Sequence, residues 1–246
     1  MSYYFANPEN ISATSFTIDG SEAGHLARVL RKQIGDKIQV FDGSGKVYSG
    51  EIKEISAEKI TCKIISYENV PARKVNLKLY QAVPKGDKFD WLVEKAIELG
   101  VSSICPLICE RSILKDIGTI KVERWKRIAL AAEKQSRQAY GVEVADPLGF
   151  TKAVSSIKSG ILSIIPWESE EEKNIESVFN NIEYKLPVNI NIFIGPEGGF
   201  THKEIDIAKS FGVTPVTLGK NILRSETAGL LASTLVLNHF GTYNGK

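Results

Sequence analysis

The segment Ile192-Phe-Ile-Gly195-Pro-Glu-Gly198-Gly199-Phe-Thr201 constrains the fold of this chain more than any other. Its apolar start predicts a buried strand and its glycines predict a loop. Thr201 and Glu204 then form the Thr-x-x-Glu capping box that begins a helix. Ligands in open α/β sheets bind where strands end in this way, and glycine lets them approach the backbone amides. The segment therefore indicates either a ligand loop of an α/β domain or an ordinary tight turn between a strand and a helix.

Alternating strands and helices are predicted for the chain after residue 74. Apolar runs indicate strands over residues 75–83, 102–107, 161–165, 188–194 and 213–218. Helical periodicity indicates helices over residues 87–99, 121–140, 202–211 and 226–239. Gly100 is expected to end the first of these helices. We therefore expect an α/β domain with a mainly parallel sheet.

A small β-rich module is predicted ahead of that domain. Strands fall at residues 37–41, 47–55 and 59–66, with turns between them. Ser21 is placed to cap a short helix that runs through Leu30. The polar, proline-containing segment 68–74 separates the β-rich part of the chain from the part in which strands and helices alternate. We therefore expect one domain over residues 1–70 and a second over residues 71–246.

Composition limits the classes of protein to consider. No apolar run approaches the roughly 18 residues that span a bilayer, and residues 1–10 lack the basic and apolar regions of a secretion signal. The cysteine count is odd and no Cys-x-x-Cys occurs, so Cys62, Cys105 and Cys109 are expected to be buried, reduced thiols. The three histidines are too few and too scattered to propose a metal site. We expect a cytoplasmic protein with no membrane partner.

The charge of the chain is unevenly distributed. Residues 73–140 hold 14 Lys and Arg against 8 Asp and Glu, although the net charge of the whole chain is only +2. Residues 1–72 hold 8 against 9, and residues 141–246 hold 9 against 12. A localised basic region in a nearly neutral chain suits a protein that presents one face to a polyanion, although basic solvated helices have the same composition.

A second glycine loop, Val216-Thr-Leu-Gly219-Lys-Asn-Ile-Leu-Arg224-Ser-Glu-Thr-Ala228, again leads from a strand into a helix. Neither loop has the Gly-x-Gly-x-x-Gly pattern of dinucleotide sites or the phosphate-loop pattern of nucleoside triphosphate sites. The pair, Ile-Gly-Pro-Glu-Gly-Gly-Phe followed by Leu-Gly-x-x-Ile-Leu-Arg-x-Glu-Thr-Ala, resembles the cofactor loops of SPOUT methyltransferases. It looks specifically like the ribosomal RNA small subunit methyltransferase E family, which methylates N3 of a uridine in 16S ribosomal RNA.

The resemblance implies a PUA-like β-barrel over residues 1–70 and a SPOUT domain over residues 71–246, with a trefoil knot over roughly residues 160–246. It implies S-adenosylmethionine as cofactor and a homodimer formed through the C-terminal domain. Its substrate would be a specific uridine of 16S ribosomal RNA in the assembled or nearly assembled small subunit. Two alternatives stay open, namely a SPOUT enzyme acting on a ribose 2′-hydroxyl or a tRNA guanine, and a non-catalytic RNA-binding factor. Residues 222–228 argue against the 2′-O enzymes.

Site residues follow from the two loops and from the resemblance. The predicted cofactor contacts are Ile165, Ile194, Gly195, Glu197, Gly198, Gly199, Leu218, Gly219, Ile222, Leu223 and Thr227. Uridine N3 is a poor nucleophile until it loses its proton, so Arg224 is predicted to stabilise the anion. Glu197 and Glu226 are the other catalytic candidates, as groups that orient the cofactor or the base edge. A charge that complements a helix N-terminus is the alternative role of Glu226.

Basic residues are the candidates for RNA binding. The predicted contacts are His25, Arg28, Arg31, Lys32, Lys85, Arg111, Arg124, Arg127, Lys134 and Arg137. His25, Arg28 and Lys32 recur at helical spacing on one face. In the long helix, the arginines lie opposite an apolar side that includes Val122 and Trp125. A merely solvated basic face is the alternative.

Overall fold

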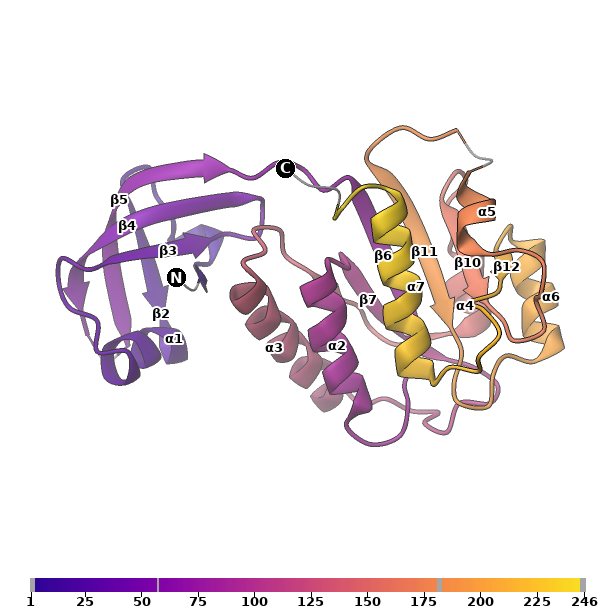
Figure 1. Ribbon diagram of the computed structural model, residues 1–246. Helices are drawn as coiled ribbons and strands as arrows, with labels where there is room; N and C mark the ends of the chain where they lie inside the picture. Colours follow the sequence, from indigo (N-terminus) through magenta and orange to yellow (C-terminus); the bar gives the residue numbers. More distant parts are fainter. Residues whose placement is uncertain (1–2, 57, 181–182, 244–246) are drawn as a thin grey trace. The chain divides into compact units, whose positions relative to one another are not determined.

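The computed structural model describes residues 3–56, 58–180 and 183–243, which fall into two compact units (Figure 1). The first unit combines residues 1–72 with residues 133–141, and the second combines residues 73–132 with residues 142–246. Residues 1–10 are the segment expected to carry no secretion signal. Its first two residues, Met1 and Ser2, lie outside the described residues.

A five-stranded sheet forms the body of the first unit. Its strands are β1 (Tyr3–Phe5), β2 (Ser15–Asp19), β3 (Lys37–Phe41), β4 (Lys46–Ile55) and β5 (Lys59–Asn69), and the short 3-10 helix η1 (Pro8–Asn10) precedes β2. The strand order is β1-β3-β4-β5-β2, and each neighbouring pair is antiparallel except β1 and β3. Alternate strand residues such as Phe16, Val40 and Ile52 are buried with Leu26 in one core. The structure thus confirms the predicted β-rich module.

The helical segment after β2 begins earlier than predicted. α1 (Gly20–Gly24) continues directly as a π-helical turn, η2 (His25–Val29). Gly20 has a φ of 63°, so the chain turns out of β2 one residue before Ser21 and Asp19 takes the N-cap position. The predicted cap at Ser21 was therefore wrong.

The helix α3 (Thr119–Ser136) ends at Ser136 and not at Tyr140, the end that the sequence predicts. Arg137 takes a left-handed φ of 57°, and the Gln138 N–H donates to the Glu133 carbonyl oxygen at 3.0 Å, as in a Schellman motif. Tyr140 instead belongs to the first unit, because its hydroxyl donates to the Val70 carbonyl oxygen at 3.0 Å.

A parallel seven-stranded sheet organises the second unit. Its strands are β6 (Val75–Ala82), β7 (Ser103–Ile108), β8 (Glu143–Val144), β9 (Leu148–Gly149), β10 (Leu162–Pro166), β11 (Val188–Ile194) and β12 (Thr214–Val216). Their order is β12-β10-β11-β6-β7-β8, with β9 also paired to β7, and every pair is parallel. Strands buried on both faces explain the nearly continuous apolar runs in the sequence.

Helices cover both faces of this sheet (Figure 1). One core packs the sheet against α2 (Lys88–Leu99), α3, α5 (Ile175–Phe179) and α7 (Ser225–His239), and the other packs it against α4 (Phe150–Ser155) and α6 (His202–Ser210). Leu77 and Leu79 of β6 face the first core, and Tyr80 and Ala82 face the second. This arrangement confirms the predicted α/β class. None of the described helices is long and apolar enough to cross a membrane.

Candidate cofactor and RNA site

Loops from neighbouring strands meet at the carboxyl edge of the parallel sheet. Because β12, β10, β11, β6 and β7 are neighbours, the segments that follow them lie along one edge (Figure 1). These segments are residues 217–224, 167–174, 195–201, 83–87 and 109–118. Both predicted glycine loops are among them, on the strands β11 and β12 that flank β10. This is the edge where ligands bind in open α/β sheets.

The first glycine loop, residues 195–201, has little room for larger residues. The predicted capping box is confirmed, since the Glu204 N–H donates to Thr201 Oγ1 at 3.2 Å and the Thr201 N–H donates to Glu204 Oε2 at 2.9 Å. Gly199 has a φ of 68°, and a Cβ there would lie 2.5 Å from Glu168 Oε1. Glycine is therefore favoured at this position by its left-handed backbone conformation, and any side chain there would have to move the Glu168 carboxylate.

Three other segments of the second unit hold the first glycine loop in place. The Lys85 backbone N–H donates to Glu197 Oε1 at 3.1 Å, and the Arg111 guanidinium donates to the Gly198 carbonyl oxygen at 2.8 Å. Ser225 Oγ donates to the Gly195 carbonyl oxygen at 2.6 Å. Glu197 and Arg111 were predicted for other roles, and here both fix the conformation of the loop. No sequence pattern indicates these bonds, because the partners are far apart along the chain.

The second glycine loop, residues 217–224, is more open. Gly219 has a φ of 107°, and no atom lies within 4 Å of where its Cβ would be. The Thr217 N–H donates to the Lys173 carbonyl oxygen at 2.7 Å, which joins the loop to the segment after β10. Ile222 is 93% exposed, and Leu218 and Leu223 are partly exposed. An almost fully exposed isoleucine beside a glycine with open space suits an apolar, planar ligand group.

The remaining candidates around α7 differ sharply in exposure. Arg224 is exposed at the N-cap position of α7, and Thr227 is exposed in the first turn. Glu226 is buried and forms an ion pair with Lys88 Nζ at 3.1 Å, a partner that no sequence pattern indicates. Of the three catalytic candidates, Arg224 is thus the one whose side chain makes no hydrogen bond or ion pair to another loop among the described residues.

Two predicted cofactor residues have fully buried side chains. Ile194 lies in the core under α2 and α7, and Ile165 lies in the core under α4 and α6. Any contact of these two residues with a cofactor has to be made by their backbone groups.

The basic residues predicted to bind RNA are found in both units. In the second unit, Lys85, Arg111, Arg124 and Arg127 are exposed, and Arg124 forms ion pairs with Asp90 and Asp87. The predicted apolar side of α3 is confirmed, because Val122, Trp125, Ala129 and Ala132 are buried.

In the first unit, His25, Arg28, Arg31 and Arg137 are exposed. Lys32 lies 3.9 Å from Asp36, and Lys134 lies 3.1 Å from Glu22. The latter contact joins the segment 133–141 to α1 within this unit. Arg31 and Arg137 both have a left-handed φ, of 50° and 57°. Such a conformation is unusual for a non-glycine residue and is often found at functional sites.

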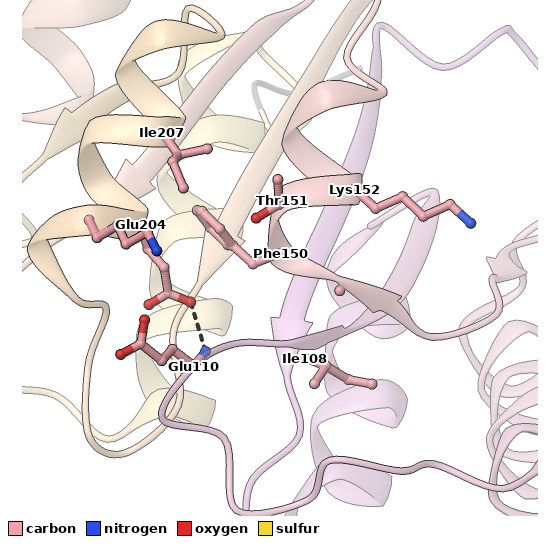
Figure 2. Close-up of a pocket in the computed structure, with 9 residues that line it drawn as sticks. Ile108, Glu110, Phe150, Thr151, Lys152, Glu204 and Ile207 are labelled. Atoms are coloured by element: carbon pink, nitrogen blue, oxygen red, sulfur yellow. Dashed lines mark hydrogen bonds between the residues drawn. The ribbon is translucent and has the colours of Figure 1, made fainter.

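A cavity of about 260 Å³ lies on the face of the sheet that α4 and α6 cover (Figure 2). Its lining includes Phe150, Lys152, Glu110, Glu204 and Ile207. The Glu110 N–H donates to Glu204 Oε1 at 2.8 Å, the bond drawn dashed in Figure 2. The Glu204 carboxylate therefore joins the segment after β7 to the start of α6, while its other oxygen completes the capping box.

The three thiols are free and buried, as predicted. Burial raises the pKa of Cys62 to about 12 and of Cys105 to about 11, so both are protonated near neutral pH. Among the described residues, no group of three or more His, Cys, Asp or Glu is placed to hold a metal ion.

Comparison with known proteins decides the family. Residues 71–237 match the model of an RNA methyltransferase domain, and residues 18–65 match that of an RNA methyltransferase PUA domain. The ribosomal RNA small subunit methyltransferase E of Bacillus subtilis is 32% identical over 91% of this chain and 90% of its own length. The chain belongs to this family. The enzyme of the same name from Synechocystis is 33% identical over 92% of this chain and 73% of its own.

A solved structure of the same family has the same fold. The ribosomal RNA small subunit methyltransferase E of Neisseria gonorrhoeae, bound to S-adenosyl methionine, is 29% identical. It superposes with a TM-score of 0.85 and covers 97% of both chains. The resemblance inferred from the two glycine loops is therefore confirmed, as is the SPOUT fold that it implied.

Proposed function

We propose that this chain transfers a methyl group from S-adenosylmethionine to N3 of a specific uridine in 16S ribosomal RNA. Membership of the methyltransferase E family supports S-adenosylmethionine-dependent methylation of ribosomal RNA. The observation that carries the proposal is the pair of glycine loops on β11 and β12, with the exposed Arg224 at the end of the second loop.

The cofactor fits the residues at this edge. Backbone groups of Gly195, Gly198, Gly199 and Gly219 would hold it, because glycine leaves them open to close approach. Ile222, with Leu218, Leu223 and Thr227, would line the adenine side. When bound, S-adenosylmethionine supplies the activated methyl group. Glu168, which lies against Gly199, adds negative charge on the side where a cationic ligand would bind.

The work of this chain is to favour the deprotonated uridine and to align it. Arg224 is exposed beside the cofactor loops, so its guanidinium can stabilise the negative charge that spreads over O2 and O4 when N3 loses its proton. Glu226 is buried against Lys88, and Glu197 accepts the Lys85 N–H. We therefore propose that both carboxylates maintain the conformation of the site. Alignment of N3 with the methyl carbon supplies most of the remaining acceleration.

RNA is proposed to bind through the exposed basic residues of both units. In the first unit these are His25, Arg28, Arg31 and Arg137, together with the partly exposed Lys32 and Lys134, and in the second they are Lys85, Arg111, Arg124 and Arg127. Shape and phosphate contacts should dominate, because a target base in structured RNA must be extruded or already unpaired. The substrate would be 16S ribosomal RNA in the assembled or nearly assembled small subunit, which places the reaction in the cytoplasm.

A homodimer formed through the second unit completes the proposal. Leu235 of α7 and Trp91 of α2 are 41% and 49% exposed, and Leu230 and Leu231 are only partly buried. These apolar side chains suit a two-fold contact between identical surfaces. RNA at one site would then meet basic residues of both protomers.

The test is a reconstituted reaction. Purified protein is incubated with methyl-labelled S-adenosylmethionine and small ribosomal subunits that lack the modification, and nucleosides from the 16S RNA are analysed by mass spectrometry. We expect labelled 3-methyluridine at one position. A labelled 2′-O-methylated nucleoside or a methylated guanine would instead show a different SPOUT reaction. Cofactor-independent RNA binding without label would show a non-catalytic factor.

A further inference from the structure

Gln81 is a buried amide that connects the two glycine loops. It lies near the end of β6 with no exposed surface, on the side of the sheet that α7 covers. Its Nε2 donates to Ser225 Oγ at 2.8 Å and to the Ala82 carbonyl oxygen at 3.1 Å. Ser225 Oγ in turn donates to the Gly195 carbonyl oxygen at 2.6 Å. One chain of hydrogen bonds thus runs from β6 through the start of α7 to the first glycine loop.

The direction of these bonds is determined by their chemistry. A serine hydroxyl has one hydrogen to donate and two lone pairs to accept with. Because the Gly195 carbonyl oxygen can only accept, the Ser225 hydroxyl donates its hydrogen to Gly195 and accepts from the Gln81 amide. Without that amide, the Ser225 hydroxyl loses one of the two partners that hold its rotamer. Gln81 therefore determines how Ser225 is presented to the first loop.

Two energetically unfavourable features lie around Gln81. Among the described residues, Gln81 Oε1 has no hydrogen-bond partner although it is buried, and such a group is costly. Gly229 lies inside α7, where glycine is less favourable than alanine. A Cβ at Gly229 would lie only 2.2 Å from Gln81 Oε1, so the glycine makes room for the amide. Both features are explained if the position of Gln81 matters more than local stability.

We propose that Gln81 is a positioning residue that sets the separation of the two cofactor loops through Ser225. Gly195 begins the first loop and Ser225 directly follows the second, so the bond between them holds the two sides of the cofactor site together. The inference rests on the proposed function, since these loops must bind S-adenosylmethionine. It adds Gln81, Ser225 and Gly229 to the residues on which cofactor affinity depends.

Calorimetry with S-adenosylmethionine tests the proposal through three single variants and one double variant. Gln81→Ala, Ser225→Ala and Gly229→Ala should each raise the Kd about tenfold, as expected for one or two lost hydrogen bonds. The KM for S-adenosylmethionine should rise equally, while kcat at saturating cofactor changes less than about twofold, because only uniform binding is lost. The double variant Gln81→Ala/Gly229→Ala should bind as Gln81→Ala does, because the added methyl group then has no amide to displace.

Controls separate positioning from general stability. Ser233→Ala removes another buried hydroxyl of α7, one with no hydrogen-bond partner among the described residues, and should leave the Kd unchanged. Ser225→Thr keeps the hydroxyl and should retain most of the affinity. Wild-type affinity in Ser225→Ala and Gln81→Ala overturns the inference, as does an additive effect of Gly229→Ala on Gln81→Ala. If Gln81→Ala does not fold, Ser225→Ala and Gly229→Ala decide. Wild-type protein that binds no S-adenosylmethionine refutes the proposed function itself.

Discussion

The Arg111 guanidinium donates a hydrogen bond of 2.8 Å to the carbonyl oxygen of Gly198, and a Cβ on that glycine would lie 3.4 Å from the Arg111 Cβ. The arginine thus covers one side of the first glycine loop and fixes the direction of a peptide group in it. A Cβ at residue 198 would be in ordinary van der Waals contact with Arg111, so a larger, branched side chain there would have to push the arginine aside.

The first prediction concerns Gly198→Val. The branched side chain would displace Arg111 and fill the space beside the loop, so S-adenosylmethionine binding should be abolished while the fold is kept. Calorimetry should give no binding heat at concentrations that saturate the wild type. Gly118→Val is the matched control, because no atom lies within 4 Å of its Cβ position. Unchanged affinity in Gly198→Val would move the cofactor site elsewhere.

Arg224→Ala should separate catalysis from cofactor binding. If its charge stabilises the uridine anion, turnover should fall by about 10²–10³, the usual cost of one preorganised electrostatic donor. The Kd for S-adenosylmethionine should change little, because the Arg224 guanidinium is proposed to act on the uridine and not on the cofactor. Single-turnover methylation and calorimetry on the same preparation measure both quantities. Equal losses in the two would mark Arg224 as a cofactor-binding or structural residue.

Arg28→Ala should weaken binding to 16S ribosomal RNA and lower its salt dependence. Loss of one phosphate contact reduces the slope of log K against log salt by about one. Filter binding over a series of salt concentrations measures that slope. Lys53→Ala is the control, since Lys53 lies in the same unit but is paired with Glu51. Equal slopes for wild type and Arg28→Ala would contradict an RNA contact at this residue.

Stability should fall at alkaline pH because of the buried thiols. Burial raises the pKa of Cys62 from 9.0 to about 12, so the folded protein keeps a proton that the unfolded chain releases near pH 9. The stabilisation is complete below pH 9 and is lost as pH rises towards 12, at up to about 1.4 kcal/mol per pH unit. Urea unfolding of wild type and Cys62→Ala between pH 7 and 10.5 tests this. The difference in unfolding free energy between the two proteins should shrink above pH 9, and a constant difference would contradict it.

The protein should sediment as a dimer. Light scattering at micromolar concentration should give about twice the 27.1 kDa chain mass. Leu235→Glu places a charge on the exposed apolar part of α7 and should give monomers with reduced methylation. A wild-type monomer that still methylates RNA would contradict both the interface and a site shared between protomers.

Local chemistry made much of the fold predictable. The capping box of Thr201 and Glu204 places the start of α6, and Gly100, with a φ of 103°, ends α2 where a glycine stop was expected. In each case, the residues that produce the signal lie within a few positions of the helix end that they determine. The end of α3 was missed because Arg137 takes the left-handed conformation that usually indicates glycine.

The site was predictable only in part for a similar reason. The glycine loops are continuous in sequence, so their position at strand ends could be inferred. The contact between Gln81 and Ser225 joins residues 144 positions apart, and that between Glu197 and Lys85 joins residues 112 positions apart. Periodicity and capping patterns contain no information on such pairs, so the sequence alone predicts catalytic and RNA-binding roles for Glu197 and Arg111 and gives no sign of their loop contacts.

The central claim is methylation of one uridine of 16S ribosomal RNA at N3, and mass spectrometry of that RNA tests it most directly. Small subunits are isolated from cells with the gene, from cells without it, and from deleted cells that express the Arg224→Ala protein. We expect 3-methyluridine at one position in the first sample, none in the second and a strongly reduced amount in the third. The same level of 3-methyluridine with and without the gene would contradict it.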